Sequence, residues 1–112
     1  MADAQAVSIN AVIFREGRHW IAQGLQHDVC AQGDTLDEVH AAFAQQLIAT
    51  AAIALELGEE PFTNIDRAPD QYWEMFGRSR ITMEAESPAT TQQPPYVPRM
   101  QPHYKVLDQA AA

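Results

Sequence analysis

Cysteine and long apolar runs are scarce in this chain of 112 residues. Cys30 is the single cysteine, so the chain cannot form an internal disulfide, and nothing indicates an oxidising compartment. No stretch approaches the about 18 consecutive apolar residues of a membrane span. The first residues lack the basic segment followed by an apolar run that marks a secretory signal. We therefore expect a cytoplasmic protein.

Basic residues are also few. The chain has 7 lysines and arginines against 15 acidic residues, for a net charge of −8. Residues 1–78 hold twelve acids and four arginines, whereas residues 79–112 hold three acids and three bases. An acidic body repels phosphate backbones, so we expect no direct nucleic-acid binding. The charge favours a basic protein partner, or it serves solubility alone.

Groups that could carry catalysis are sparse as well. Three segments expected to form strands, residues 7–14, 19–25 and 29–33, contain no acidic residue, although two-metal phosphoryl chemistry needs carboxylates on adjacent strands. The five glycines are scattered singly and form no phosphate-binding loop. His27, Cys30 and His40 lack the partners of a zinc site or an activated nucleophile, so His27 is interpreted as a turn residue and Cys30 as a small buried side chain. We expect no enzyme, no cofactor and no metal.

Three short segments near the N-terminus have the composition of strands. Residues 7–14 are rich in β-branched and apolar side chains, residues 15–18 suit a hairpin loop, and residues 19–25 alternate between two faces. Ile21 and Leu25 are the expected core-facing pair, and Gly24 indicates a bulge or a close backbone approach. Residues 29–32 form a third expected strand.

A turn and a helix cap follow the third strand. Gly33 and Asp34 have turn chemistry, since glycine tolerates positive φ and aspartate bonds to nearby amides. Thr35 and Glu38 fit the Thr-x-x-Glu capping box, in which each side chain accepts from a backbone N–H of the other residue. These four residues therefore predict the junction between sheet and helix.

The segment from Leu36 to Leu57 has the three- and four-residue periodicity of a helix packed on a sheet. Its apolar stripe comprises Leu36, Val39, Phe43, Leu47, Ala51 and Leu55. Further apolar residues widen the arc beyond what one small sheet needs, which suggests either a dimer contact or a docked C-terminal segment. Gly58 is placed to end the helix.

The remaining chain predicts less regular structure. Residues 61–65 could add an edge strand, residues 68–78 a short second helix, and residues 81–85 a weak strand. Five of the seven prolines lie between Pro88 and Pro102, which is typical of a disordered tail. We therefore expect an α+β domain over residues 1–78 and a proline-rich, disordered tail over residues 79–112.

Four aromatic residues are candidates for a partner interface. Tyr72, Trp73 and Phe76 belong to the expected second helix, where Phe76 can pair with Tyr72 or Trp73 in covering the sheet or the first helix. Trp20 lies on the strand face opposite Ile21 and Leu25, so it either packs under the second helix or joins an interface.

The order of hairpin, third strand, turn and long helix resembles the HicB-like family, which comprises the antitoxins of HicA–HicB toxin–antitoxin pairs and their stand-alone relatives. The matching residues are Trp20-Ile21-Ala22-Gln23-Gly24-Leu25 and Ala31-Gln32-Gly33-Asp34-Thr35-Leu36-Asp37-Glu38-Val39. The resemblance covers about residues 7–58.

This resemblance implies a partial ribonuclease-H-like fold, with a small antiparallel sheet (β-β-β-α) and one long helix packed on it. It also implies homo-oligomerisation and, in antitoxin members, binding of a small basic HicA-like toxin. Those members usually carry a C-terminal DNA-binding module, which residues 79–112 do not match. We therefore expect a non-enzymatic, protein-binding, antitoxin-like protein, or alternatively an orphan homo-oligomeric regulatory or ligand-binding domain with no toxin.

Overall fold

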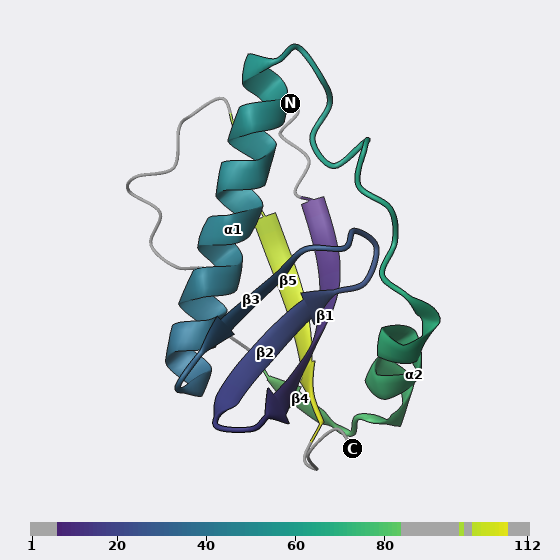
Figure 1. The fold of residues 1–112 in the computed structure, drawn as a ribbon. Helices are drawn as coiled ribbons and strands as arrows, with labels where there is room; N and C mark the ends of the chain where they lie inside the picture. Colours follow the sequence, from purple (N-terminus) through teal and green to yellow (C-terminus); the bar gives the residue numbers. More distant parts are fainter. Residues whose placement is uncertain (1–6, 84–96, 98–99, 108–112) are drawn as a thin grey trace.

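The computed structural model describes residues 7–83, 97 and 100–107, which form an α+β fold with a five-stranded mixed sheet and two helices (Figure 1). The strands lie in the order β3-β2-β1-β5-β4. The elements are β1 (Val7–Glu16), β2 (His19–Gly24), β3 (Cys30–Gly33), α1 (Leu36–Glu56), α2 (Asp70–Arg78), β4 (Ile81–Met83) and β5 (Met100–Val106).

The first three strands form the antiparallel meander that their sequence predicts. β1 and β2 pair with Val12 opposite Gln23, and the turn between them contains Gly17 at φ 64°. β3 pairs with β2 on the far side, with Ala22 opposite Ala31. Gly24 ends β2 in a crowded position, where a Cβ atom would lie 2.9 Å from the His27 carbonyl oxygen. The expectation of a close backbone approach at this glycine is confirmed.

Helix α1 packs across one face of the sheet, and the predicted stripe is confirmed. Val39, Phe43, Leu47 and Ala51 are fully buried with the sheet residues that point toward them, Ile9, Ala11, Ile13 and Ala22. The helix ends where Gly58 adopts φ 77°. The Gly58 N–H donates to the Leu55 carbonyl and the Glu59 N–H to the Ala54 carbonyl, which is the Schellman arrangement.

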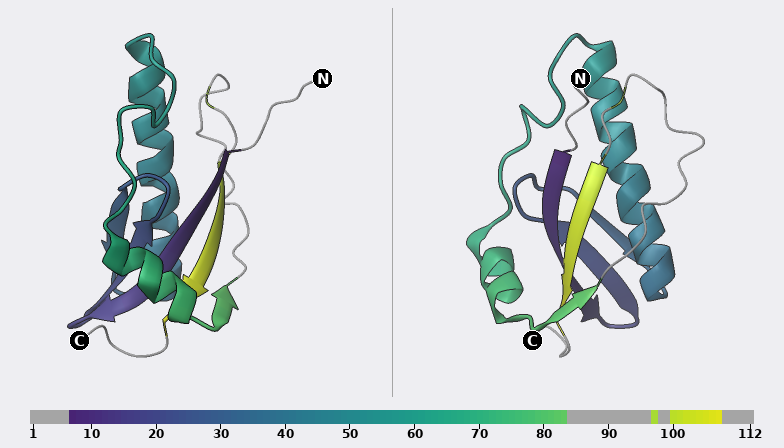
Figure 2. Two further views of the ribbon diagram at one scale, coloured as in Figure 1. Left: turned by 90° about the vertical axis from the view of Figure 1, so that its right-hand side faces the viewer. Right: turned by 180° about the vertical axis from the view of Figure 1, so that it is seen from behind.

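Helix α2 covers the opposite face of the sheet, and Figures 1 and 2 show the two helices on either side of it. A second buried cluster fills this side, comprising Val12, Phe14, Leu25, Met75 and Leu107. Because successive residues of β1 alternate between the two clusters, the strand is buried on both faces. Ile21 and Leu25 do point into a core, but it is the core under α2.

The C-terminal part of the sheet corrects two expectations. β5 pairs in parallel with β1 over seven positions, from Val7 opposite Met100 to Ile13 opposite Val106, so the sheet is mixed rather than antiparallel. β4 pairs with β5 on its other edge. Residues 81–83 and 100–106 therefore belong to the sheet, and the predicted disordered tail over 79–112 is wrong for them. Residues 79, 80, 97 and 107 are described outside the strands, and residues 84–96, 98–99 and 108–112 lie outside the described part.

Pro102 explains why β5 is hard to recognise in the sequence. Proline lacks the N–H that a strand donates to its neighbour, so a proline argues against a central strand. Here β4 pairs only with Tyr104, Lys105 and Val106, and Pro102 lies beyond that ladder with β1 as its described neighbour. The strand therefore accommodates proline where one of its edges has no partner among the described strands.

The connection between α1 and α2 contains no edge strand, contrary to the expectation for residues 61–65. Phe62 has a positive φ of 67°, which is incompatible with an extended strand. Its buried ring stacks on His27 with the ring centroids 4.9 Å apart. Asp28 N–H donates to the Asp66 carbonyl, and Ala68 N–H donates to the Leu25 carbonyl. The connection is therefore fastened to the loop between β2 and β3.

Tyr104 predicts how the fold responds to alkaline pH. The residue is buried in β5, its hydroxyl lies 2.9 Å from His40 Nδ1, and burial raises the pKa of the phenol well above its usual value of 10. Below pH 10 both folded and unfolded states keep the proton; above it only the unfolded chain loses it. The free energy of unfolding should then fall by about 1.4 kcal/mol per pH unit through this group. Urea titrations between pH 8 and 11.5 should show a shallower fall in Tyr104→Phe, and an equal fall would contradict the assignment.

Candidate functional site

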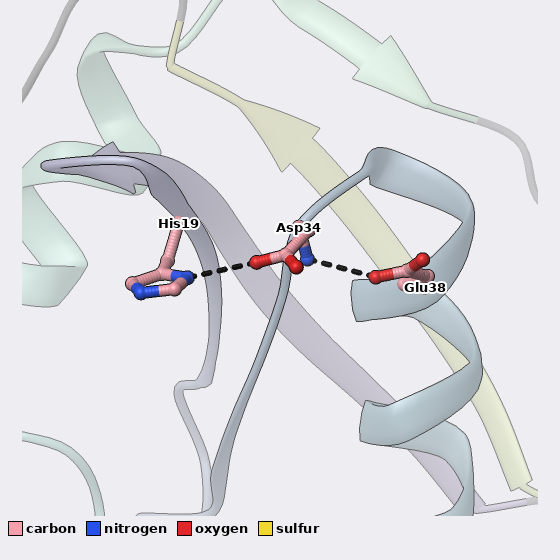
Figure 3. A network of polar contacts seen from close by, with 3 residues as sticks. All are labelled: His19, Asp34 and Glu38. Atoms are coloured by element: carbon pink, nitrogen blue, oxygen red, sulfur yellow. Dashed lines mark hydrogen bonds and ion pairs between the residues drawn. The ribbon is translucent and has the colours of Figure 1, made fainter.

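The junction between β3 and α1 is held by a chain of polar contacts (Figure 3). His19 Nδ1, at the start of β2, lies 3.0 Å from a carboxylate oxygen of Asp34. The backbone N–H of Asp34 in turn donates to the Glu38 carboxylate at 3.0 Å. These groups are exposed, so the ion pair contributes little on its own. Together they join the β1–β2 hairpin, the turn and the first turn of α1.

The helix cap is present in a modified form. The Thr35 hydroxyl accepts from the Glu38 N–H at 3.1 Å, as the capping box predicts. The return bond goes one residue further back, because the Glu38 carboxylate accepts from the N–H of Asp34 rather than that of Thr35. The cap therefore satisfies one amide of the helix and one of the preceding turn.

Gly33 is required for a reason that its sequence context does not reveal. Among the described glycines, Gly17 and Gly58 have positive φ and Gly33 does not, so the tolerance of positive φ is not what requires glycine at this position. A Cβ atom at Gly33 would lie 2.6 Å from the Val39 nitrogen and 2.9 Å from the Glu38 carbonyl carbon. The residue thus lets the end of β3 approach the backbone of α1.

Thr35→Ala should lower the free energy of unfolding by about 1 kcal/mol, because the N–H of Glu38 loses its side-chain acceptor. Thr35→Ser keeps that acceptor and is the matched control. Urea denaturation followed by tryptophan fluorescence measures both variants. Equal midpoints for the alanine and serine variants would contradict the cap.

The four candidate interface aromatics lie on two different faces. Trp20 packs at the edge of the cluster under α1, with the Arg15 guanidinium 5.2 Å from its ring centroid. Tyr72, Trp73 and Phe76 pack on the cluster under α2. One of the two alternatives for Trp20, packing under the second helix, is therefore wrong. The four residues do not form one surface.

The aromatic residues of α2 are partly covered by cations. The Arg67 guanidinium lies 4.7 Å from the Trp73 ring centroid, and Lys105 Nζ lies 4.8 Å from that of Phe76. The Trp73 indole N–H also donates to the Ala68 carbonyl at 3.2 Å. These contacts hold the half-buried aromatic side chains in their packing against the sheet.

A different surface stands out on α1. Between the exposed acids of its first turn (Asp37 and Glu38) and of its last turn (Glu56), its solvent side is uncharged. We call this part, with Leu57 beyond it, the outer face: Ala41, Gln45, Gln46, Ala49, Ile53 and Leu57. No charged residue occurs between His40 and Glu56, although solvent-facing helices ordinarily carry charge. Ile53 is 59% exposed and Leu57 69% exposed. Figure 1 shows the last turns of α1 extending past the ends of the strands.

The charge of the chain is concentrated around this helix. From His19 to Asp66 the sequence has no lysine or arginine and eight acids: Asp28, Asp34, Asp37, Glu38, Glu56, Glu59, Glu60 and Asp66. The other seven acids of the chain are balanced by its seven basic residues. The whole net charge of −8 therefore belongs to the segment that contains β2, β3 and α1. The sequence analysis noted the wide apolar arc of this helix. It missed that the arc lies within the segment that carries the whole net charge.

The residues considered for catalysis or metal binding are dispersed. Cys30 is exposed on β3, contrary to the expectation of burial, because its neighbour Ala31 faces the cluster under α1 and Cys30 lies on the other face of this short edge strand. His27 stacks on Phe62, and His40 bonds to Tyr104. Within residues 7–83, 97 and 100–107, no three histidine, cysteine, aspartate or glutamate side chains group as metal ligands would.

Among the described helices, α1 alone has the length and hydropathy that a membrane span requires. Core helices of soluble proteins meet the same criterion, and α1 buries Phe43 and Leu47 against the sheet.

Comparison with known proteins identifies no relative. No family model matches the chain, and neither a curated protein nor a solved structure is significantly similar to it.

Proposed function

We propose that this chain is a HicB-like protein that acts by binding another protein, antitoxin-like and without enzymatic activity. The order of elements supports the proposal. A β-hairpin, a third antiparallel strand, the turn at Gly33 and a long helix across the sheet follow one another as the resemblance implies. This helix, with its uncharged outer face, is the observation that carries the proposal.

The charge distribution agrees with a basic protein partner. The segment from His19 to Asp66 carries eight acids and no lysine or arginine, which attracts cationic proteins and repels nucleic acids. Of the described residues after Ser79, residues 81–83 and 100–106 form β4 and β5 of the same sheet. The proposal therefore does not include operator binding by this part of the chain.

Affinity capture of the tagged full chain from its native host, combined with light scattering of the purified protein, tests the proposal. We expect recovery of a small basic protein, a homo-oligomer, or both, with capture of the basic protein reduced at high salt. The tag alone is the control. Recovery of neither a basic protein nor an oligomer would overturn the proposal.

The neighbourhood of the gene separates the antitoxin from its orphan alternative. An antitoxin should lie beside a short reading frame that encodes a basic protein, and coexpression of the two should yield a complex. An isolated gene, together with a ligand-dependent rise in melting temperature, would favour the orphan regulatory or ligand-binding domain.

A further inference from the structure

We propose that the outer face of α1 is the docking surface for a basic protein that presents a small uncharged centre between cationic ends. The inference rests on the proposed function and names the surface through which it would operate. It follows from three properties of the helix: its uncharged outer face, the acids at both of its ends, and the absence of lysine and arginine from the segment that contains it.

The C-terminal half of the outer face, which holds Ile53 and Leu57, favours contact with protein rather than water. Ile53 and Leu57 lie one turn apart and are both more than half exposed. Ala49 precedes them on the same side, and its short side chain allows a partner backbone to approach closely. Burial of Ile53 and Leu57 on docking would remove apolar surface from water, which is the main favourable term in most protein associations.

The two ends of the outer face carry acids that no described basic side chain pairs with. Asp37 and Glu38 lie in the first turn of α1, where negative charge suits the helix dipole. Glu56, Glu59 and Glu60 lie at the other end, where the dipole is already negative and the last turn has no basic residue. The acids at the C-terminal end therefore oppose the dipole of the free helix, and a cationic partner would relieve that repulsion.

The same charges argue against a second copy as the occupant. Two outer faces packed together would bring two segments of charge −8 into contact, and neither contains a lysine or arginine to pair across the interface. Like charges brought close together cost association free energy, so the pairing of identical faces is disfavoured. An anionic membrane surface is disfavoured for the same reason.

Photo-crosslinking in the native host tests the surface directly. The full chain carries a benzophenone amino acid at position 49 on the outer face or, as the control, at position 71 on the exposed side of α2. We expect position 49, and not position 71, to crosslink to a basic protein. A crosslink from position 49 to a second copy, or within the same chain, would overturn the inference.

The partner that crosslinking identifies is then purified, and its affinity is measured for a matched pair of variants of this chain. Gln45→Arg places a cation on the outer face, whereas Gln71→Arg makes the same change on α2, and both sites are exposed in helices. We expect Gln45→Arg to weaken binding at least about tenfold and Gln71→Arg to leave it within about twofold. Neutralising Glu56, Glu59 and Glu60 together should slow association and reduce its salt dependence.

The outcomes separate this inference from the proposed function. If a basic partner is recovered but Gln45→Arg leaves its affinity unchanged, the partner binds elsewhere and only the surface is wrong. If neither crosslinking position nor the tagged chain captures a basic protein, the inference fails together with the antitoxin-like function. Circular dichroism melting of both variants shows whether the fold is retained, and a melting temperature equal to that of the parent chain assigns the lost affinity to the surface.

Discussion

Gly33→Val should lower the free energy of unfolding by about 3 kcal/mol, which is a large fraction of the total unfolding free energy of a domain of this size. The new side chain would begin 2.6 Å from the backbone nitrogen of Val39 and 2.9 Å from the carbonyl carbon of Glu38. Both are backbone atoms in the first turns of α1, so neither can rotate away as a side-chain tip would. Relief requires β3 and α1 to separate, which would also pull the Thr35 cap out of register.

The measurement is urea denaturation of the full chain, and Gly33→Ala is measured beside Gly33→Val as the smaller substitution at the same position. Alanine adds the Cβ atom alone and should cost about 2 kcal/mol. Gly77→Ala in α2 is the matched control, because nothing lies within 4 Å of a Cβ atom there and its φ is ordinary. That variant should be neutral or more stable by up to about 1 kcal/mol. A Gly33→Ala variant as stable as the parent chain would show that the approach of β3 to α1 is looser than described.

The comparison between Gly33 and Gly58 shows how far sequence reasoning reaches. Gly58 was expected to end the helix, because it follows a long apolar segment and precedes Glu59-Glu60-Pro61, and it does so with a positive φ. Helix termination is local, so the neighbouring residues are sufficient to predict it. The need for glycine at position 33 arises from the packing of two elements against each other, and no local pattern encodes that distance.

The first half of the fold was predictable because its contacts are mostly local in sequence. The β1–β2 hairpin closes through Gly17, and the stripe of α1 repeats with helical period. β5 was missed because its partner β1 lies about ninety residues earlier, because proline interrupts it, and because only Met100, Tyr104 and Val106 mark its buried positions. A parallel pairing over such a separation leaves no short-range signal.

The candidate site was predictable to a similar extent. Trp20 and the aromatics of α2 were sound candidates by residue type, yet the structure places them on opposite faces and uses them for packing. The outer face of α1 has a signal that could have been read from sequence alone, namely a helix with no charge from Ala41 to Leu55 between two acidic ends. What sequence could not provide is the direction in which that uncharged arc points.

A chain that ends at Met83 should lose cooperative unfolding altogether, because it lacks the strand that covers β1. β5 occupies seven register positions along β1 and buries Met100, Tyr104 and Val106, with Leu107 following it. At about 1.5–3 kcal/mol for each buried side chain, their loss amounts to about 6–12 kcal/mol, which is comparable with the whole stability of a typical domain. Far-UV circular dichroism during a urea titration is the measurement, and we expect a broad drift in place of a transition.

Point variants in the full chain locate that effect within β5. Tyr104→Ala removes a buried ring that packs edge-on against Phe43, with centroids 6.0 Å apart, and should cost about 3–5 kcal/mol. His103→Ala changes the adjacent exposed residue on the same strand and should stay within about 0.5 kcal/mol of the parent chain. A sharp transition in the truncated chain, or equal effects of the two substitutions, would restore the view that everything after residue 78 is a tail. If the truncated chain has no transition and only Tyr104→Ala is strongly destabilising, α1 depends for its position on β5. The helix proposed to bind a partner would then be held in place by a strand at the far end of the sequence.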